Sequence, residues 1–343
     1  MGRRRLTIFG LAAAATIVLI AGTLLLLPGS APAQKAPEAP AEKAPEVPAE
    51  KAPEAAVEKA PEAAADLPAG YAGAETCKGC HEEAWQKFSR TKMGRLFLFQ
   101  ARNTRERLAC ENCHGPGRAH AEAGGGKGVG GMITFAKNDP TPIEQRNQMC
   151  LTCHTKGTRV FWKGSGHDMR DVACTGCHRV MEDHSPRNQL AMSTEIETCG
   201  TCHQQKRATL LRSSHMPLRE GKMSCSSCHN PHGTVTPALL KENSPNDNCF
   251  RCHAEKRGPF LWQHAPAVES CSNCHDPHGS NHERMLKVAK PRLCQQCHIE
   301  SRHPTSPYGR DTASLKFMMG SSCLNCHVNI HGSNHPAGFA FTR

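Results

Sequence analysis

Hydrophobic residues are distributed very unevenly along this chain. Apolar and small residues run without interruption over residues 6–27, whereas residues 70–343 contain no apolar stretch long enough to span a membrane. The pattern predicts one apolar helix near the N-terminus. The longer part that follows must fold without extended apolar elements.

The apolar run has the features of an export signal. Arg3, Arg4 and Arg5 precede it, and an A-P-A tripeptide ending at Ala33 follows it. A basic start, an apolar centre and a small-residue site together predict a signal peptide cleaved after Ala33. The run is also long enough to cross a bilayer, so an uncleaved inner-membrane anchor through residues 6–27 is the alternative. Either way the remainder is exported, because the arginine cluster stays in the cytoplasm.

Residues 34–69 are predicted to form a disordered linker. An eight-residue unit that begins K-A-P-E occurs four times between Lys35 and Asp66. Alternating charge, regular proline and few large apolar side chains leave too little surface to bury for folding. If extended, the repeats would reach roughly 100 Å. The segment is therefore either an inert tail or a tether for the folded part, residues 70–343.

Composition shows that this folded part lacks a conventional core. The chain has 343 residues, with 20 cysteines and 21 histidines but only 11 Phe, 3 Trp and 2 Tyr. A hydrophobic content of 38% with so few aromatic side chains is thin for a chain of this length. Something other than side chains must therefore fill the interior, and cysteine usage far above the average indicates what it is.

All twenty cysteines lie in ten C-x-x-C-H motifs, which we number 1 to 10 along the chain. Two thiols about one helical turn apart, followed by a histidine, form the attachment site of a c-type haem. Zinc sites do not require a histidine after each cysteine pair, and disulfide scaffolds do not repeat one spacing ten times. The sequence thus predicts ten covalent haems. The predicted thioether residues are Cys77, Cys80, Cys110, Cys113, Cys150, Cys153, Cys174, Cys177, Cys199, Cys202, Cys225, Cys228, Cys249, Cys252, Cys271, Cys274, Cys294, Cys297, Cys323 and Cys326. The predicted proximal iron ligands are His81, His114, His154, His178, His203, His229, His253, His275, His298 and His327.

Ten haems would account for both the thin core and the charge. The porphyrins would form the hydrophobic interior, so we expect short α-helices at the motifs, irregular loops between them and little or no β-sheet. The formal net charge of the whole chain is +11. Haem propionates, about two per haem, would neutralise much of this excess, which therefore does not indicate nucleic-acid binding.

The remaining histidines suggest distal iron ligands. One histidine precedes and one follows most even-numbered motifs, which predicts a repeated two-haem module. The repeat is clearest between S-C-S-S-C-H-N-P-H-G and S-C-S-N-C-H-D-P-H-G, residues 224–233 and 270–279. The candidate distal ligands are Met93, His120, His167, His184, His215, His232, His264, His278, His303 and His331.

Several of these assignments have alternatives. Met93 stands where the upstream histidine of motif 2 would be expected, and methionine as an axial ligand would raise the potential of one haem. If Met93 only packs against a porphyrin, His282 or His335 would complete the set, or one haem would stay open. Met181 competes in the same way with His184.

The order of motifs resembles the decahaem cytochromes of porin–cytochrome conduits, the MtrA/PioA/DmsE type. The resemblance covers nearly all of residues 71–343. Its most specific stretches are G-G-M-I-T-F-A-K, C-H-A-E-K-R-G-P-F-L-W-Q-H-A-P, C-H-D-P-H-G-S, L-C-Q-Q-C-H and S-C-L-N-C-H-V-N-I-H-G-S-N-H-P. The chain departs from this family at Met93, where a histidine is usual, and in the K-A-P-E linker.

The resemblance implies an elongated chain of ten haems inside an outer-membrane β-barrel porin. Such a protein would carry electrons between periplasmic or inner-membrane cytochromes and an extracellular multihaem cytochrome, terminal reductase or metal, as in anaerobic respiration by extracellular electron transfer. It would be periplasmic, associated with the outer membrane, and an electron carrier without catalytic residues. The alternatives are a soluble or inner-membrane-tethered periplasmic shuttle and a multihaem reductase with one open haem site.

Overall fold

The computed structural model describes residues 67–298 and 322–342, which belong to one unit with the bounds Glu58–Arg343. The predicted signal or anchor, residues 1–33, and the repeats of the predicted linker lie outside the described residues. So does the candidate ligand His303. All ten motifs lie inside the described ranges. None of the described helices is long and apolar enough to cross a membrane.

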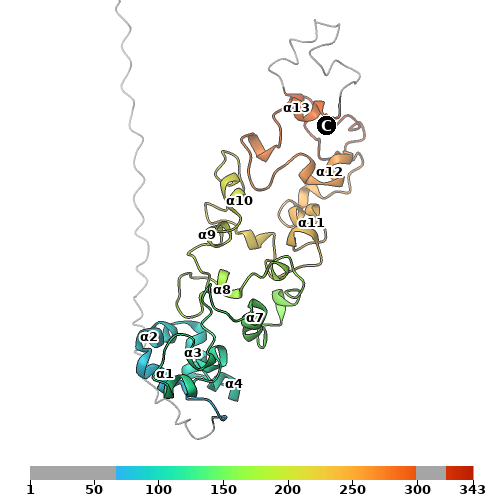
Figure 1. Ribbon diagram of the computed structural model, residues 1–343. Helices are drawn as coiled ribbons and strands as arrows, with labels where there is room; N and C mark the ends of the chain where they lie inside the picture. Colours follow the sequence, from blue (N-terminus) through green and yellow to red (C-terminus); the bar gives the residue numbers. More distant parts are fainter. Residues whose placement is uncertain (1–66, 299–321, 343) are drawn as a thin grey trace, which may run out of the picture. The chain divides into compact units, whose positions relative to one another are not determined.

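The described residues form short helices joined by loops (Figure 1). The α-helices are α1 Ala74–Cys80, α2 Glu82–Arg90, α3 Lys92–Phe99, α4 Thr104–Arg107, α5 Glu111–His114, α6 Arg118–Glu122, α7 Ile143–Leu151, α8 Cys174–Cys177, α9 Glu195–Gly200, α10 Gln204–Thr209, α11 Pro245–Phe250, α12 Ala265–Glu269 and α13 Arg292–Gln295. The 3-10 helices are η1 Val129–Gly131, η2 Gly157–Arg159, η3 Asp168–Arg170, η4 Cys225–Ser227, η5 Pro237–Leu239, η6 Ala254–Lys256, η7 Cys271–Asn273, η8 Glu283–Met285 and η9 Cys323–Asn325. Within these ranges β-structure is limited to isolated bridges, which confirms the predicted fold class.

Every C-x-x-C-H motif closes the same helical turn. In all ten, the backbone amide of the histidine donates to the carbonyl of the first cysteine, with N to O distances of 2.9–3.0 Å. Side chains three and four positions apart lie on one face of a helix. The turn therefore brings the two thiols and the imidazole of each motif to the same side of the backbone.

Odd- and even-numbered motifs are built differently. Odd-numbered motifs lie in or at the end of a helix that begins before them, such as α9 and α11. The side chains of Thr194 and Ser244 cap these two helices by accepting from the amides of Glu197 and Asp247. Even-numbered motifs instead consist of a single turn, α5, α8, η4, η7 or η9. The two-motif repeat seen in the sequence is thus also a repeat in local structure.

Apolar packing contributes little to the described part of the chain. Its buried hydrophobic residues are Phe88, Phe97, Ala109, Trp162, Leu210 and Leu286. Only the first three form a cluster, in which α2 and α3 pack beside motif 2. This confirms the thin core expected from the composition.

Buried polar groups add to the weak apolar packing near the N-terminal end of the described residues. The Glu111 carboxylate, only 1% exposed, accepts from the backbone amides of Ala72, Gly73 and Gly117 at 2.7–2.8 Å. Because Glu111 lies inside motif 2, these bonds hold the segment before α1 against that motif. Hydrogen bonds to a charged acceptor are the stronger kind in a protein.

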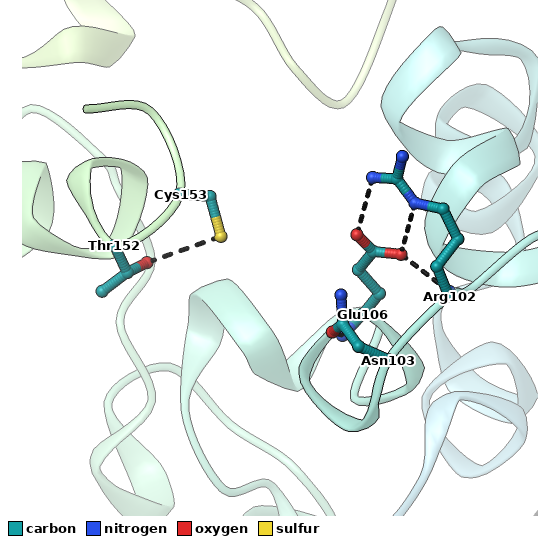
Figure 2. A network of polar contacts seen from close by, with 5 residues as sticks. All are labelled: Arg102, Asn103, Glu106, Thr152 and Cys153. Carbon is teal, nitrogen blue, oxygen red and sulfur yellow. Dashed lines mark hydrogen bonds and ion pairs between the residues drawn. The ribbon is translucent and has the colours of Figure 1, made fainter. Parts of the chain in front are cut away.

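A second polar contact lies in the segment that precedes motif 2. Figure 2 shows the Arg102 guanidinium on the Glu106 carboxylate, with N to O distances of 2.8 and 3.2 Å. Asn103 caps α4 by accepting from the Glu106 amide. The same view shows Thr152 of motif 3, whose hydroxyl lies 4.0 Å from the Cys153 sulfur.

Polar bridges also join the two motifs of a module. The Asn147 side chain accepts from the amide of Cys174 at 2.8 Å, and Asn246 accepts from the amide of Cys271 at 2.6 Å. Both asparagines are buried, and both precede an odd-numbered motif by three residues. Each bridge therefore ties the helix before an odd-numbered motif to the first cysteine of the next one.

Candidate functional site

Six motif histidines lie next to a histidine from outside the motifs. The centres of the paired rings are 6.1–6.3 Å apart. The planes lie within 19° of parallel in five pairs and are inclined by 67° in the sixth. The pairs are His81 with His120, His178 with His232, His203 with His167, His229 with His278, His275 with His331, and His298 with His264.

This spacing fits one metal ion between two imidazoles. Two ring nitrogens about 2 Å from a shared ion are about 4 Å apart, and each ring centre lies about 1 Å further out. The expected separation of the centres is therefore about 6 Å, as observed. Rings that merely stack on each other would not need the same distance between their centres in all six pairs.

Backbone hydrogen bonds orient the motif histidines. In every even-numbered motif the histidine Nδ1–H donates to a carbonyl at 2.6–2.9 Å. The acceptors for His114, His178, His229, His275 and His327 are the carbonyls of Ile133, Asn188, Ala238, Arg284 and Ala340. A proton held on Nδ1 leaves the Nε2 lone pair free to bind a metal.

Three of the five carbonyls that orient these histidines come from strained backbone. Asn188, Ala238 and Arg284 have φ values of 56°, 56° and 54°. The left-handed region costs a residue with a Cβ about 1–2 kcal/mol. The strain occurs at equivalent places in motifs 4, 6 and 8, 9 or 10 residues after the histidine, so it serves a common purpose, which is to aim a carbonyl at the imidazole. Sequence analysis missed these residues, although their regular distance from the motif was visible.

Three distal candidates are followed by a glycine that lets one module contact the previous one. Gly233, Gly279 and Gly332 have φ values of 114°, 126° and 143°. A Cβ there would overlap the carbonyl of Phe161, the carbonyl of Thr209 or the ring of Phe260 respectively. Close approach of the two backbones therefore requires glycine after His232, His278 and His331. Because of this close contact, the histidine before each glycine lies beside a motif two places earlier in the chain.

Further bonds connect neighbouring pairs. His167 Nδ1–H donates to the carbonyl of Pro231 at 2.7 Å, and Pro231 directly precedes His232. The His264 ring is placed in an equivalent way near the carbonyl of Ile330, directly before His331. Each of these contacts links the ring pair of an odd-numbered motif to that of an even-numbered motif.

Burial keeps several distal candidates neutral. It lowers the pKa of His232 to about 4, with the charges of His178 and Arg159 acting in the same direction. Burial likewise lowers the pKa values of His264, His278 and His331. Neutral imidazole is the form that binds a metal, so these sites favour ligation.

Other candidates are not brought into such pairs. Within the described residues no histidine ring is stacked on His114, His154 or His253 of motifs 2, 3 and 7, and His114 instead contacts the Phe135 ring at 5.5 Å. His215 is turned toward Glu220, with Nε2 3.1 Å from the carboxylate oxygen. That hydrogen bond raises the pKa of His215.

The loop after motif 4 also lies at a junction between modules. His184 Nε2 is 3.4 Å from the Glu182 carboxylate, which lies 4.0 Å from the Lys87 ammonium in α2. His184 also lines a cavity of about 370 Å³ with Thr201 and Arg207. Met181 is 37% exposed.

The two spare histidines take part in hydrogen bonds with neighbouring residues. The Nδ1 atom of His335 accepts from the amide of Ala337 at 3.1 Å, and its carbonyl accepts from Trp262 Nε1. The amide of His282 donates to the hydroxyl of Ser280 at 2.9 Å. The bonds with Ser280 and Ala337 lie within the turn after an even-numbered motif, whereas the bond from Trp262 comes from the segment after motif 7.

The cysteines form a continuous series along the chain. The first thiol of each odd-numbered motif interacts with the first thiol of the following motif. These pairs are Cys77 with Cys110, Cys150 with Cys174, Cys199 with Cys225, Cys249 with Cys271, and Cys294 with Cys323. Second thiols connect the modules in turn: Cys113 is close to Cys153, Cys177 to Cys202, Cys228 to Cys252 and Cys274 to Cys297. The thiols of each motif are therefore within electrostatic range of those of the motifs beside it in the chain.

Together these features fit c-type haem. All twenty cysteines are free rather than joined in disulfides, so they are available for thioether formation. Each motif turn puts two thiols and an imidazole on one side of the chain, and six motifs face a second imidazole. Few apolar side chains of the described residues are buried, as expected where porphyrins form the interior.

Comparisons with known proteins agree with this site. Residues 110–202 match the family model described as cytochrome c-type protein NrfB-like, and residues 215–258 and 264–303 match the doubled CXXCH motif. The fold and site therefore define a multihaem c-type cytochrome, an electron carrier rather than an enzyme.

A curated relative identifies the family more closely. The chain is 43% identical over 272 residues to the multiheme cytochrome MtrA of Shewanella baltica. This match covers 78% of the present chain and 80% of the relative. The chain thus belongs to the MtrA family of multihaem cytochromes.

Proposed function

We propose that this protein holds ten c-type haems and carries electrons across an outer membrane from inside a partner β-barrel porin. The electrons would pass between periplasmic or inner-membrane cytochromes and an extracellular multihaem cytochrome, terminal reductase or metal. Its export would depend on residues 1–33, and residues 34–69 would form a spacer before the haem-binding part.

The observation that carries this proposal is the unbroken order of the ten motifs. First thiols of the two motifs in a module interact, and second thiols interact electrostatically with those of the next module. Bound c-type haem supplies a one-electron iron couple. Ten attachment sites, each adjacent to the next, are the arrangement that a conductor requires and that a single-site redox enzyme does not.

The side chains have distinct tasks in this proposal. The cysteines hold the ten groups in sequence, and the motif histidines provide one axial ligand each. The distal ligands would be Met93, His120, His167, His184, His215, His232, His264, His278, His303 and His331. Ligands on both faces of the iron exclude substrates and so favour electron transfer over catalysis at iron.

A barrel partner follows from the physics of the bilayer. Charged side chains, irregular loops and exposed backbone polar groups are costly in contact with lipid. A chain of this kind crosses a membrane only inside another protein, and a large closed barrel provides such an interior.

The test is purification of the tagged protein from separated inner- and outer-membrane fractions in mild detergent. Haem staining, mass spectrometry of bound partners and N-terminal mass analysis would follow. The proposal expects an outer-membrane barrel partner, a mass corresponding to ten haems and a mature chain that begins at Gln34.

Two other outcomes would replace the proposal. Recovery only from the inner membrane, with residues 1–33 intact and no barrel, would indicate a tethered periplasmic shuttle. Binding of carbon monoxide or nitrite at one haem of the native protein would favour a reductase with an open site.

A further inference from the structure

One member of a regular series of candidate ligands is a methionine. Each of motifs 1, 3, 5 and 7 is followed, 11 to 13 residues after its histidine, by one candidate. The series consists of Met93, His167, His215 and His264. Met93 is therefore in register with three histidines of the same repeat.

The structure shows where members of this series are directed. His167 follows motif 3 and pairs with His203 of motif 5, and His264 follows motif 7 and pairs with His298 of motif 9. Each thus faces the motif two places further along the chain. The same displacement directs Met93, which follows motif 1, to motif 3 and its histidine His154.

The surroundings of Met93 agree with this direction. Its side chain is partly buried against Phe88, Phe97 and Ala109, and Cys113 of motif 2 packs against the same cluster. The turn α5 of motif 2 in turn contacts α7, the helix that leads into motif 3. Met93 therefore lies beside the part of motif 2 that adjoins motif 3.

The backbone at Met93 is also held firmly. Met93 is in the first turn of α3, which is capped by Thr91. The fully buried Thr91 hydroxyl accepts from the Gly94 amide at 2.9 Å. A Cβ at Gly94 would overlap the Phe88 carbonyl, so α3 approaches the end of α2 closely. The position from which the Met93 side chain extends is therefore fixed.

We infer that the Met93 sulfur is the distal iron ligand at motif 3, opposite His154. The inference rests on the proposed function only in that haem occupies motif 3. A thioether opposite histidine raises the potential of iron above that of a site with two histidines. One station near the N-terminal end of the series would therefore retain electrons more strongly than its neighbours.

The test is spectroscopy of the purified, full-length, haem-loaded protein in the ferric state. Iron with a methionine ligand has a long-wavelength sulfur-to-iron charge-transfer band that iron with two histidines lacks. We expect this band in the wild type with the intensity of one haem. We expect its loss in Met93→His, together with a downward shift of the one haem that titrates at the highest potential.

Met181→Leu is the matched control, because Met181 is the competing methionine after motif 4. The band should persist in this variant. Its loss there, its persistence in Met93→His, or its absence from the wild type would each overturn the inference.

Two further measurements separate possible failures. Should Met93→His not acquire haem, Met93→Leu is expected to bind carbon monoxide at one haem where the wild type binds none. Carbon monoxide binding by the wild type at motif 3 would contradict the inference. The isolated protein suffices for all these spectra, so failure to find a barrel partner would not affect them, and loss of the methionine assignment would not affect co-purification.

Discussion

The ring of His167 lies 6.1 Å from the ring of His203, although motif 4 and 36 positions of the sequence separate the two residues. The same His167 donates to the carbonyl just before His232, and the His232 ring pairs with His178 of motif 4. Candidate ligands of two consecutive motifs are thus joined by one hydrogen bond. The modules are interlocked, because each supplies side chains to its neighbours.

The first prediction concerns the distal role of His232. Replacement by alanine should open one axial position at motif 4, so that about one haem in ten becomes high-spin and binds carbon monoxide. The measurement is carbon monoxide difference spectroscopy of the reduced protein.

The control for this prediction is His282→Ala, which removes a spare histidine from the turn after motif 8. This variant should bind no carbon monoxide. An unchanged spectrum for His232→Ala, or carbon monoxide binding by His282→Ala, would contradict the proposed ligand set.

The second prediction concerns backbone strain behind motif 6. Ala238 has a φ of 56° and offers its carbonyl to His229. Ala238→Gly should stabilise the protein by about 1 kcal/mol, because glycine adopts positive φ without steric cost. The midpoint of thermal unfolding of the haem-loaded protein should rise.

Ala208→Gly is a suitable control, since Ala208 is also exposed but lies in the helix α10. Glycine in a helix should instead lower stability by about 0.5–1 kcal/mol. Destabilisation of both variants to the same extent would mean that Ala238 is unstrained.

The third prediction concerns the buried carboxylate of Glu111. Glu111→Gln should destabilise the protein by about 1.5–3 kcal/mol, because one of its acceptor oxygens becomes an amino group facing backbone amides. Limited proteolysis should cleave residues 67–73 more rapidly, because the Glu111 bonds hold this segment against motif 2 in the wild type.

Glu75→Gln supplies the comparison, because Glu75 lies in the first turn of α1 but is exposed. Its cleavage rate should match that of the wild type. Equal rates for all three proteins would show that the Glu111 bonds do not hold the segment.

The fourth prediction concerns acid stability. Hydrogen bonding by Arg102 lowers the pKa of Glu106 from 4.5 to about 2. A carboxyl group with a lowered folded-state pKa stabilises the protein above its unfolded pKa, and this contribution is lost as the pH falls from about 4.5 toward 2. Glu106→Gln should therefore melt below the wild type at neutral pH, and the two melting temperatures should converge over that interval.

Arg102→Met tests the cause, because it removes the partner and leaves the carboxylate. Its melting temperature should also approach that of the wild type as the pH falls. Glu122→Gln, a substitution at an exposed position of α6, should show a constant difference. A gap between Glu106→Gln and the wild type that does not narrow in acid would contradict the assignment.

Much of the site could be predicted from local sequence, because its basic unit is local. The five residues of a C-x-x-C-H motif form a single turn, and the bond from histidine to the first cysteine recurs in all ten. Alternation of odd- and even-numbered motifs was also visible, since the turns S-C-S-S-C-H and S-C-S-N-C-H repeat both residues and spacing. The thin core and the lack of strands in the described ranges followed from the composition.

The pairing of histidines depends on the tertiary structure. His120 follows motif 2 but faces His81 of motif 1, whereas His232 follows motif 6 but faces His178 of motif 4. Spacing alone could not distinguish these partners, because the decisive contacts are between modules. Examples are the close approach of Gly233 to Phe161 and of Gly279 to Thr209.

The sequence by itself determined the ten C-x-x-C-H motifs, the histidine that ends each of them and a two-motif repeat. Local helical geometry makes these features independent of the rest of the fold. Only the tertiary structure decided which candidate ligand faces which motif and which carbonyls orient the imidazoles. The physical reason is that these contacts join residues tens of positions apart in the sequence. The motif spacing allows many arrangements of these residues, and close backbone packing at glycines together with the strained carbonyls selects one of them.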